Sequence, residues 1–163
     1  MVVPKPNSEN LRICGDYKKV NMKIEDDNYK LPNVQDMLAK LCENGRKPTI
    51  FSSLDLAGAF NQLFLDDESS EILALNTHKG ILKARRLSYG VKSAPSIFQA
   101  KMNKILSGID NVFCYVDDVL IATETAREHL DVLKSVFERF KRYNVKLNKA
   151  KCSWFQTQLK YLG

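Results

Sequence analysis

Two adjacent aspartates, Asp117 and Asp118, are the residues best suited to do chemistry in this sequence. They separate the apolar runs Val112–Val116 and Val119–Ala122, a two-residue spacing that predicts a β-hairpin with both carboxylates at its tip. Adjacent carboxylates repel each other unless a cation lies nearby, and a divalent metal would supply that charge. An ordinary acidic surface turn is the alternative interpretation.

A third acid, Asp55, stands 62 residues before Asp117 at the end of the β-rich segment Thr49–Leu56. Small residues follow it, and we expect their backbone N–H groups to be open to an anion such as a triphosphate: Ala57, Gly58 and Ala59. If this strand lies beside the hairpin, three carboxylates converge. Two Mg²⁺ ions need such an arrangement for phosphoryl transfer. Alternatively, Asp55 caps a helix.

The elements that must position these acids alternate between helix and strand. Apolar periodicity with start and stop residues predicts three helices: from Asn33 to Asn44, from Ser93 to Gly108, and over Leu130–Phe140 with a stop at Asn144. Further strands are predicted at Leu11–Ile13, Tyr17–Val20, Glu71–Asn76, Gly80–Leu87, Val145–Leu147 and Gln158–Leu162. This order predicts an α+β domain with a largely antiparallel sheet backed by helices.

Composition narrows the class of protein. With 163 residues and 44% hydrophobic residues, the chain can form one compact domain with a sizeable core. No apolar run approaches the roughly 20 residues of a membrane span, so we expect no membrane partner and no secretion signal. The four cysteines form no C-x-x-C pair and there are only two histidines, which argues against zinc and for reduced thiols in an intracellular protein.

The excess of positive over negative charge lies in the last part of the sequence. The net charge is +6, and residues 126–163, with nine basic and three acidic residues, account for all of it. Such a basic segment suits phosphate backbones, but a solvated helix face would look similar.

Five ordered blocks resemble the motifs of reverse transcriptases. Tyr115-Val116-Asp117-Asp118 is similar to their Y-x-D-D signature, and Leu54–Gln62 to their first-aspartate motif. The others are Leu11–Asn21, Leu87–Gln99, and Leu147–Cys152 followed by Tyr161–Gly163. Gly15 departs from the family's pattern, in which a β-branched residue is common at that place. The amino-acid sequence of residues 75–80 is similar to that of the polymerases of gypsy-type LTR retrotransposons.

The resemblance implies a right-hand polymerase palm with partial fingers. Residues 1–50 and 66–88, approximately, would be fingers and the remainder palm, with the thumb and RNase H absent. Asp55 and Asp117 would bind two Mg²⁺ ions, for which Mn²⁺ could substitute, and Asp118 would complete the acidic cluster. The Leu56 carbonyl could add a ligand.

The resemblance also implies a nucleotide pocket. Arg12 and Lys5 would hold the triphosphate, Tyr89 would shape the pocket, and Lys151 would assist the leaving pyrophosphate. An aromatic ring at Phe60 would clash with a ribose 2′-hydroxyl and select deoxynucleotides. Alternatively, Lys5 and Lys151 are solvated surface lysines and Phe60 is a core aromatic. For Phe60 both interpretations can hold, because one ring can pack in the core and exclude the 2′-hydroxyl at the same time.

The implied activity is RNA-directed DNA polymerisation. Partners would be an RNA or DNA template with its primer, dNTPs, and other domains of a polyprotein, in a cytoplasmic retroelement particle. A non-catalytic, domesticated nucleic-acid-binding remnant is one alternative. An RNA-dependent RNA polymerase is another, and Phe60 argues against it because such an enzyme must admit the 2′-hydroxyl.

Overall fold

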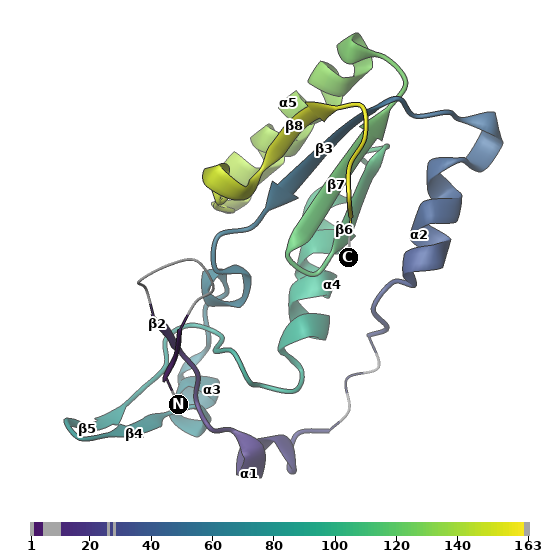
Figure 1. Ribbon diagram of the computed structural model, residues 1–163. Coiled ribbons are helices and arrows are strands. Elements are labelled where there is room, and N and C mark those ends of the chain that lie inside the picture. Colours follow the sequence, from purple (N-terminus) through teal and green to yellow (C-terminus); the bar gives the residue numbers. More distant parts are fainter. Residues whose placement is uncertain (1, 5–10, 26, 28, 162–163) are drawn as a thin grey trace. The chain divides into compact units, whose positions relative to one another are not determined.

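The chain forms two compact units in the computed structural model, which describes residues 2–4, 11–25, 27 and 29–161 (Figure 1). Unit 1 comprises Met1–Tyr29 and Gly58–Phe98, and unit 2 comprises Lys30–Ala57 and Gln99–Gly163. Among the described residues, no helix is both long enough and apolar enough to cross a membrane.

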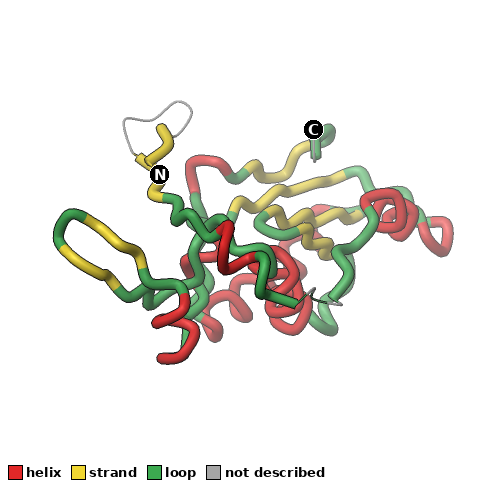
Figure 2. The backbone as a smooth tube through the Cα atoms, turned by 90° about the horizontal axis from the view of Figure 1, so that it is seen from below, coloured by secondary structure: helices red, strands yellow, loops and turns green. Residues whose placement is uncertain are grey.

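A four-stranded antiparallel sheet is the centre of unit 2 (Figures 1 and 2). Its order is β6 (Val112–Tyr115), β7 (Asp118–Thr123), β3 (Ile50–Asp55) and β8 (Ser153–Gln156). The two central strands, β3 and β7, pair over six consecutive residues without a bulge. The prediction of an antiparallel sheet is confirmed.

Helices back this sheet on one face (Figure 1). They are α5 (Ala126–Tyr143) and α4 (Ala94–Leu106), which begins in unit 1 and continues into unit 2. Caps explain the bounds of α5: the Thr125 side chain accepts the Glu128 N–H, and Asn144 takes a left-handed conformation. Unit 2 also holds α2 (Val34–Leu41), capped by Asn33, and 3₁₀ turns at Glu43–Gly45 and Lys149–Lys151.

A buried histidine joins α5 to three strands of the sheet. The ring nitrogens of His129 lie 2.7 Å from Ser52 Oγ and 2.7 Å from Thr123 Oγ1. Ser52 Oγ also accepts the Phe155 N–H, so its own hydrogen can be donated to His129 Nε2. His129 Nδ1–H then donates to Thr123, whose hydroxyl donates to the Thr125 carbonyl. This pattern of donors and acceptors fits a neutral imidazole.

Unit 1 has its own small core, which is built around Tyr17. The Tyr17 ring packs with Leu73, Leu87 and Val91, and its hydroxyl donates to the Leu73 carbonyl at 3.1 Å. A Cβ on Gly15 would lie 2.4 Å from two carbons of this ring. The departure at Gly15 therefore has a structural cause, because the Tyr17 ring occupies the space of a side chain.

The secondary structure of unit 1 corrects two predicted strands. Of the predicted strand Tyr17–Val20, Tyr17 is instead the N-cap of the helix α1 (Lys18–Asn21), and the other three residues lie within this helix. Glu71 and Ile72, the start of the second predicted strand, instead form the last turn of the helix α3 (Asp67–Ile72). The Asp66 side chain caps the start of this helix by accepting the Ser69 N–H. The other elements are β1 (Val2–Pro4), β2 (Leu11–Ile13), the 3₁₀ turn Ala59–Gln62, β4 (Leu75–Thr77) and β5 (Gly80–Leu82).

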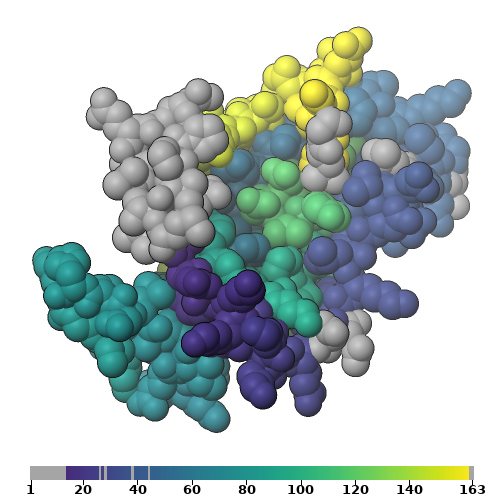
Figure 3. Space-filling view, turned by 60° about the horizontal axis from the view of Figure 1, so that its bottom comes forward, coloured from purple at the N-terminus to yellow at the C-terminus, as the bar shows by residue number. Residues whose placement is uncertain are grey.

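The hairpin of β4 and β5 projects from the rest of unit 1 (Figure 3). It is shorter than predicted, since β5 ends at Leu82 and not at Leu87. In unit 2, the predicted strand Val145–Leu147 contributes only a single bridge from Leu147 to Leu56. The predicted strand Gln158–Leu162 is not formed over Gln158–Tyr161, and the last strand, β8, lies earlier in the chain.

The buried histidine predicts an acid-sensitive fold. Burial lowers the pKa of His129, whereas an unfolded histidine titrates near pH 6.5. The stabilisation by neutral His129 is therefore complete above about pH 6.5 and is lost as the pH falls toward the folded pKa. We expect the free energy of unfolding, measured with urea, to fall between pH 7.5 and pH 5.5. His129→Gln should abolish this fall, and His78→Gln, at an exposed position, should retain it. Equal slopes in all three proteins would contradict the assignment.

Candidate active site

The aspartate hairpin turns one residue earlier than predicted. β6 ends at Tyr115, the two turn residues are Val116 and Asp117, and Asp118 is the first residue of β7. The prediction that Asp117 and Asp118 share the tip is therefore wrong, because Tyr115 pairs with Asp118 and the two-residue turn moves to Val116 and Asp117. Asp117 is exposed, while Asp118 is half-buried.

The turn contains a strained residue. Val116 has a φ of 53°, a left-handed conformation that is rare for a β-branched residue and that tight hairpins usually give to glycine. The buried side chain of Gln99 holds the turn in this state: its Oε1 accepts the Val116 N–H at 2.7 Å, and its Nε2 donates to the Cys114 carbonyl at 2.9 Å. These bonds offset a backbone conformation that Val would otherwise avoid.

The strand register places the third aspartate beside the hairpin. Asp55, the last residue of β3, is the cross-strand partner of Asp118 in β7. The Leu56 N–H donates to the Asp117 carbonyl at 3.1 Å and extends the contact by one residue. Because opposite residues of an antiparallel pair point to the same face, Asp55 and Asp118 project together from one end of the sheet.

The carboxylates of Asp55, Asp117 and Asp118 interact electrostatically. Burial raises the pKa of Asp118, and the negative charges of Asp117 and Asp55 raise it further. Lys151 opposes this shift, and its Nζ lies 3.7 Å from Asp55 Oδ2. The Lys151 side chain is 69% exposed, so this ion pair is weakly held and can be exchanged for another anion.

The three acids have the chemistry of a site for hard divalent cations. As the side chains lie, no three His, Cys, Asp or Glu residues in the described part of the chain are arranged to hold a metal ion. The donors themselves fit such an ion, because carboxylate oxygens are the ligands that Mg²⁺ prefers. A bound cation would also relieve the repulsion that raises the pKa of Asp118.

The small residues after Asp55 differ from the expectation in one respect. The Ala57 N–H donates to the Lys146 carbonyl at 2.9 Å, so it is not open to an anion. Gly58 has a φ of 57°, which explains a glycine at the start of the following 3₁₀ turn. Ala59 is buried.

Unit 1 contains the aromatic residues that were predicted for the nucleotide pocket. The Phe60 ring lies 5.2 Å from the Tyr89 ring and meets the Phe98 ring edge-on at 5.8 Å, centroid to centroid. Phe60 and Tyr89 are both half-buried. Phe60 thus packs against the core with one edge and remains accessible to solvent. The Arg12 backbone pairs with Val3 between β2 and β1, while Lys5 lies outside the described residues.

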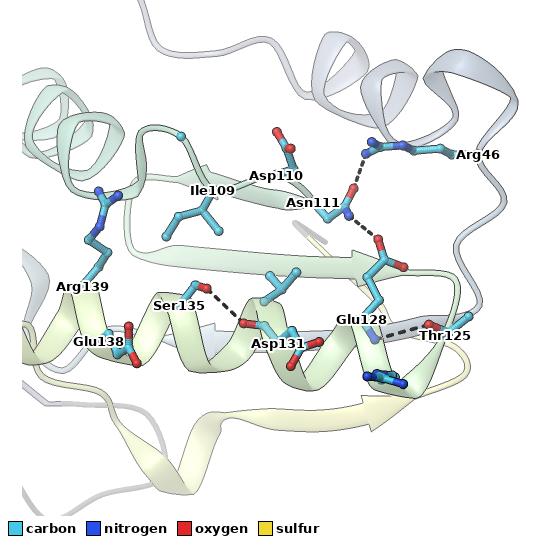
Figure 4. Close-up of a pocket in the computed structure, with 13 residues that line it drawn as sticks. Arg46, Ile109, Asp110, Asn111, Thr125, Glu128, Asp131, Ser135, Glu138 and Arg139 are labelled. Carbon is cyan, nitrogen blue, oxygen red and sulfur yellow. Dashed lines mark hydrogen bonds between the residues drawn. The ribbon is translucent and has the colours of Figure 1, made fainter.

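A cavity in unit 2 is not lined by the three aspartates (Figure 4). Its volume is about 730 Å³, and it lies between α5 and the loop before β6. Asn111 bridges its wall, accepting from Arg46 and donating to Glu128 at 2.7 Å.

Comparison with known proteins identifies the family. Residues 3–163 match the family model described as reverse transcriptase (RNA-dependent DNA polymerase). The chain belongs to the reverse transcriptase family. It is 36% identical over 170 residues to the retrovirus-related Pol polyprotein from transposon 412 of Drosophila melanogaster, covering 100% of this chain and 13% of the polyprotein.

Solved structures agree with this reverse transcriptase assignment. The foamy viral protease–reverse transcriptase in complex with double-stranded DNA superposes with a TM-score of 0.88 at 25% identity, over 99% of this chain and 28% of the other. Its complex with an RNA/DNA hybrid gives a TM-score of 0.85 at 25% identity, over 99% and 21%. This chain therefore spans a small part of the proteins that it matches.

Two residues that support the reverse transcriptase hairpin received no role from the sequence. Gln99 is one, and its signal was a polar residue three and seven positions before the buried Met102 and Leu106 of the same helix. Tyr161 is the other: its hydroxyl donates to the Asp118 carbonyl at 3.2 Å, and burial raises its pKa. No local pattern in the sequence indicates this second contact.

The Gln99 side chain, which clamps the hairpin through two hydrogen bonds to its backbone, can be tested by removing its polar atoms. Gln99→Leu would leave the partly buried Val116 N–H and the buried Cys114 carbonyl without their partner, which costs about 1–3 kcal/mol per group. We expect urea denaturation to show a loss of this size. Asn103→Leu, which removes the exposed acceptor of the same Gln99 amide at 2.8 Å, should cost less than about 1 kcal/mol. Equal losses would show that Gln99 does not hold the turn.

Proposed function

We propose that this reverse transcriptase domain is the catalytic part of an RNA-directed DNA polymerase. In the reaction, the primer 3′-hydroxyl oxygen attacks the α-phosphorus of a dNTP, the bond from that phosphorus to the bridging oxygen breaks, and pyrophosphate leaves. The observation that carries the proposal is the pairing of Asp55 with Asp118 across β3 and β7, next to Asp117. Family membership over residues 3–163 supports it.

Two Mg²⁺ ions, or Mn²⁺ in their place, would bind to Asp55 and Asp117, with Asp118 and the Leu56 carbonyl as further donors. When bound, such ions stabilise the attacking and leaving oxygens of an in-line displacement. The strand register supports this assignment, since it holds Asp55 and Asp118 on one face of the sheet. The rigid support of Asp117 by the Gln99-clamped turn serves the same purpose.

Further residues would hold the nucleotide. Lys151, which is paired with Asp55 at 3.7 Å, can exchange this carboxylate for the pyrophosphate and donate a proton to it. Arg12 and Lys5 would bind the triphosphate, together with backbone N–H groups near Gly58 and Ala59. Phe60 and Tyr89, in contact through their rings, would form the wall beside the sugar.

The substrates would be dNTPs and an RNA or DNA template with its primer. The complexes of the foamy viral protein with double-stranded DNA and with an RNA/DNA hybrid support this substrate class. We also propose that the parent protein is the polyprotein of a gypsy-type LTR retrotransposon with further polymerase domains. The similarity to the transposon 412 polyprotein and the amino-acid sequence of residues 75–80 support that origin.

Neutralising one aspartate tests the activity. In the chain joined to the rest of its own reading frame, Asp117→Asn should abolish extension of a DNA primer on RNA, because the variant keeps the side chain's size and loses its charge. Binding of primer–template should weaken far less, since contacts to phosphates dominate it. Asp110→Asn, at another exposed aspartate of unit 2, is the control and should extend normally. Unchanged extension by Asp117→Asn would exclude the catalytic assignment.

Replacing Phe60 tests the choice of sugar. Phe60→Ala should open space for a 2′-hydroxyl, so the preference for a deoxynucleotide over its ribonucleotide should fall by about 1–3 kcal/mol. The measurement compares kcat/KM for one ribonucleotide and its deoxy partner. Phe137→Ala, at a 40% exposed aromatic in unit 2, should leave the ratio unchanged. Unfolding is measured in parallel, because Phe60 also packs on Phe98. An unchanged ratio in Phe60→Ala would mean that the ring only packs.

A further inference from the structure

An exposed aromatic ring in unit 1 is held beside an arginine in a fixed arrangement. Phe64 is 74% exposed, and the Arg86 guanidinium carbon lies 3.4 Å from the centre of its ring. Arg86 Nη1 also donates to the Gln62 carbonyl at 3.1 Å, which fixes the plane of the guanidinium. One face of the ring is therefore covered by a planar cation, and most of the side chain remains open to solvent.

The backbone forces this pair outward. Phe64 and Arg86 are partners in an antiparallel bridge. It is flanked by hydrogen bonds from the Leu65 N–H to the Arg85 carbonyl at 3.2 Å and from the Leu87 N–H to the Leu63 carbonyl at 3.0 Å. The three leucines belong to the core of unit 1. Because side chains alternate between faces, Phe64 and Arg86 must point to solvent.

The exposure of Phe64 has no evident benefit for folding. An exposed contact between a cation and a ring stabilises a protein less than burial of the same ring would. Rigid aromatic rings stacked with arginine are, however, what single-stranded nucleic acids bind, because every base has a flat face. Arg86 itself supplies a cation for the phosphates. The charge around the pair is mixed: residues 79–92 contain five basic residues and no acidic one, whereas residues 66–71 contain four acidic residues, and Glu71 pairs with Lys83.

We propose that Phe64 and Arg86 form a stacking platform for the unpaired template strand. The proposal rests on the polymerase function above. Phe64 follows Phe60 by four residues, so the platform lies within about 14 Å of the proposed sugar wall. In a primed template, the strand that is still unpaired next to the nucleotide pocket is the template. Its bases can stack on the platform, whereas paired bases cannot.

Binding experiments with the 163-residue chain test the platform. The probe is a fluorescent single-stranded RNA about ten nucleotides long, a length suited to groove-type sites. Phe64→Leu keeps an apolar side chain but removes the ring, and it should weaken binding about tenfold. Arg86→Lys keeps the charge but loses the plane, so it should weaken binding with little change in the salt dependence of the dissociation constant.

The matched control is Ile81→Ser. Ile81 is also 74% exposed and lies in the same unit, but it has no ring. Binding by this variant should equal that of the unmodified chain, and blunt duplex should bind Phe64→Leu and the unmodified chain equally. The proposal is overturned if Phe64→Leu binds the single strand normally, if Ile81→Ser loses as much, or if binding of blunt duplex falls equally.

Primer extension separates this proposal from the polymerase function. In the chain joined to its own reading frame, the measured quantity is the ratio of extension on templates with long and with single-nucleotide overhangs. Phe64→Leu should lower this ratio and Ile81→Ser should not. If the unmodified protein extends both templates and Phe64→Leu leaves the ratio unchanged, the platform is wrong while the polymerase stands. If the unmodified protein extends neither, the polymerase function fails whatever the binding shows.

Discussion

The antiparallel ladder between β3 and β7 is the constraint on which the candidate active site depends. It pairs Asp55 with Asp118 at its last step, and a slip of one residue would move Asp55 to the opposite face of the sheet. The His129 network holds this register from the helix side, because one imidazole bonds Ser52 of β3 and Thr123 of β7 at the same time. Site geometry and core stability are therefore linked through the same two strands.

The hairpin that carries Asp117 shows how the fold stabilises an unfavourable turn. Val116 has a positive φ without being glycine, and Asp117 beside it adds charge repulsion. Gln99 satisfies the turn's backbone from the buried side, while Tyr161 donates to the Asp118 carbonyl from the chain's last described segment. A turn held by long-range hydrogen bonds is positioned more rigidly than its own sequence would allow, and rigidity is what a catalytic acid requires.

In unit 1, the aromatic residues differ in how far they are buried. Tyr17 is buried and fills the space beside Gly15, Phe60 is half-buried beside Tyr89, and Phe64 is exposed beneath Arg86. Alternation along a short extended segment accounts for the outward position of Phe64, since neighbouring leucines enter the core. One segment of chain thus serves the core, the proposed nucleotide pocket and the proposed template platform.

Local features of the sequence determined the elements that carry the site. The cap at Asn33 and the stop at Asn144 predicted helix ends, and the spacing of Asp55, Asp117 and their apolar flanks predicted a hairpin and a strand that ends in an acid. These features are encoded by residues a few positions apart. The tertiary structure alone decided the turn at Val116, the clamp by Gln99 and the engagement of the Ala57 N–H. Each depends on a hydrogen-bond partner at least 15 residues away in sequence, and no local pattern specifies such a partner.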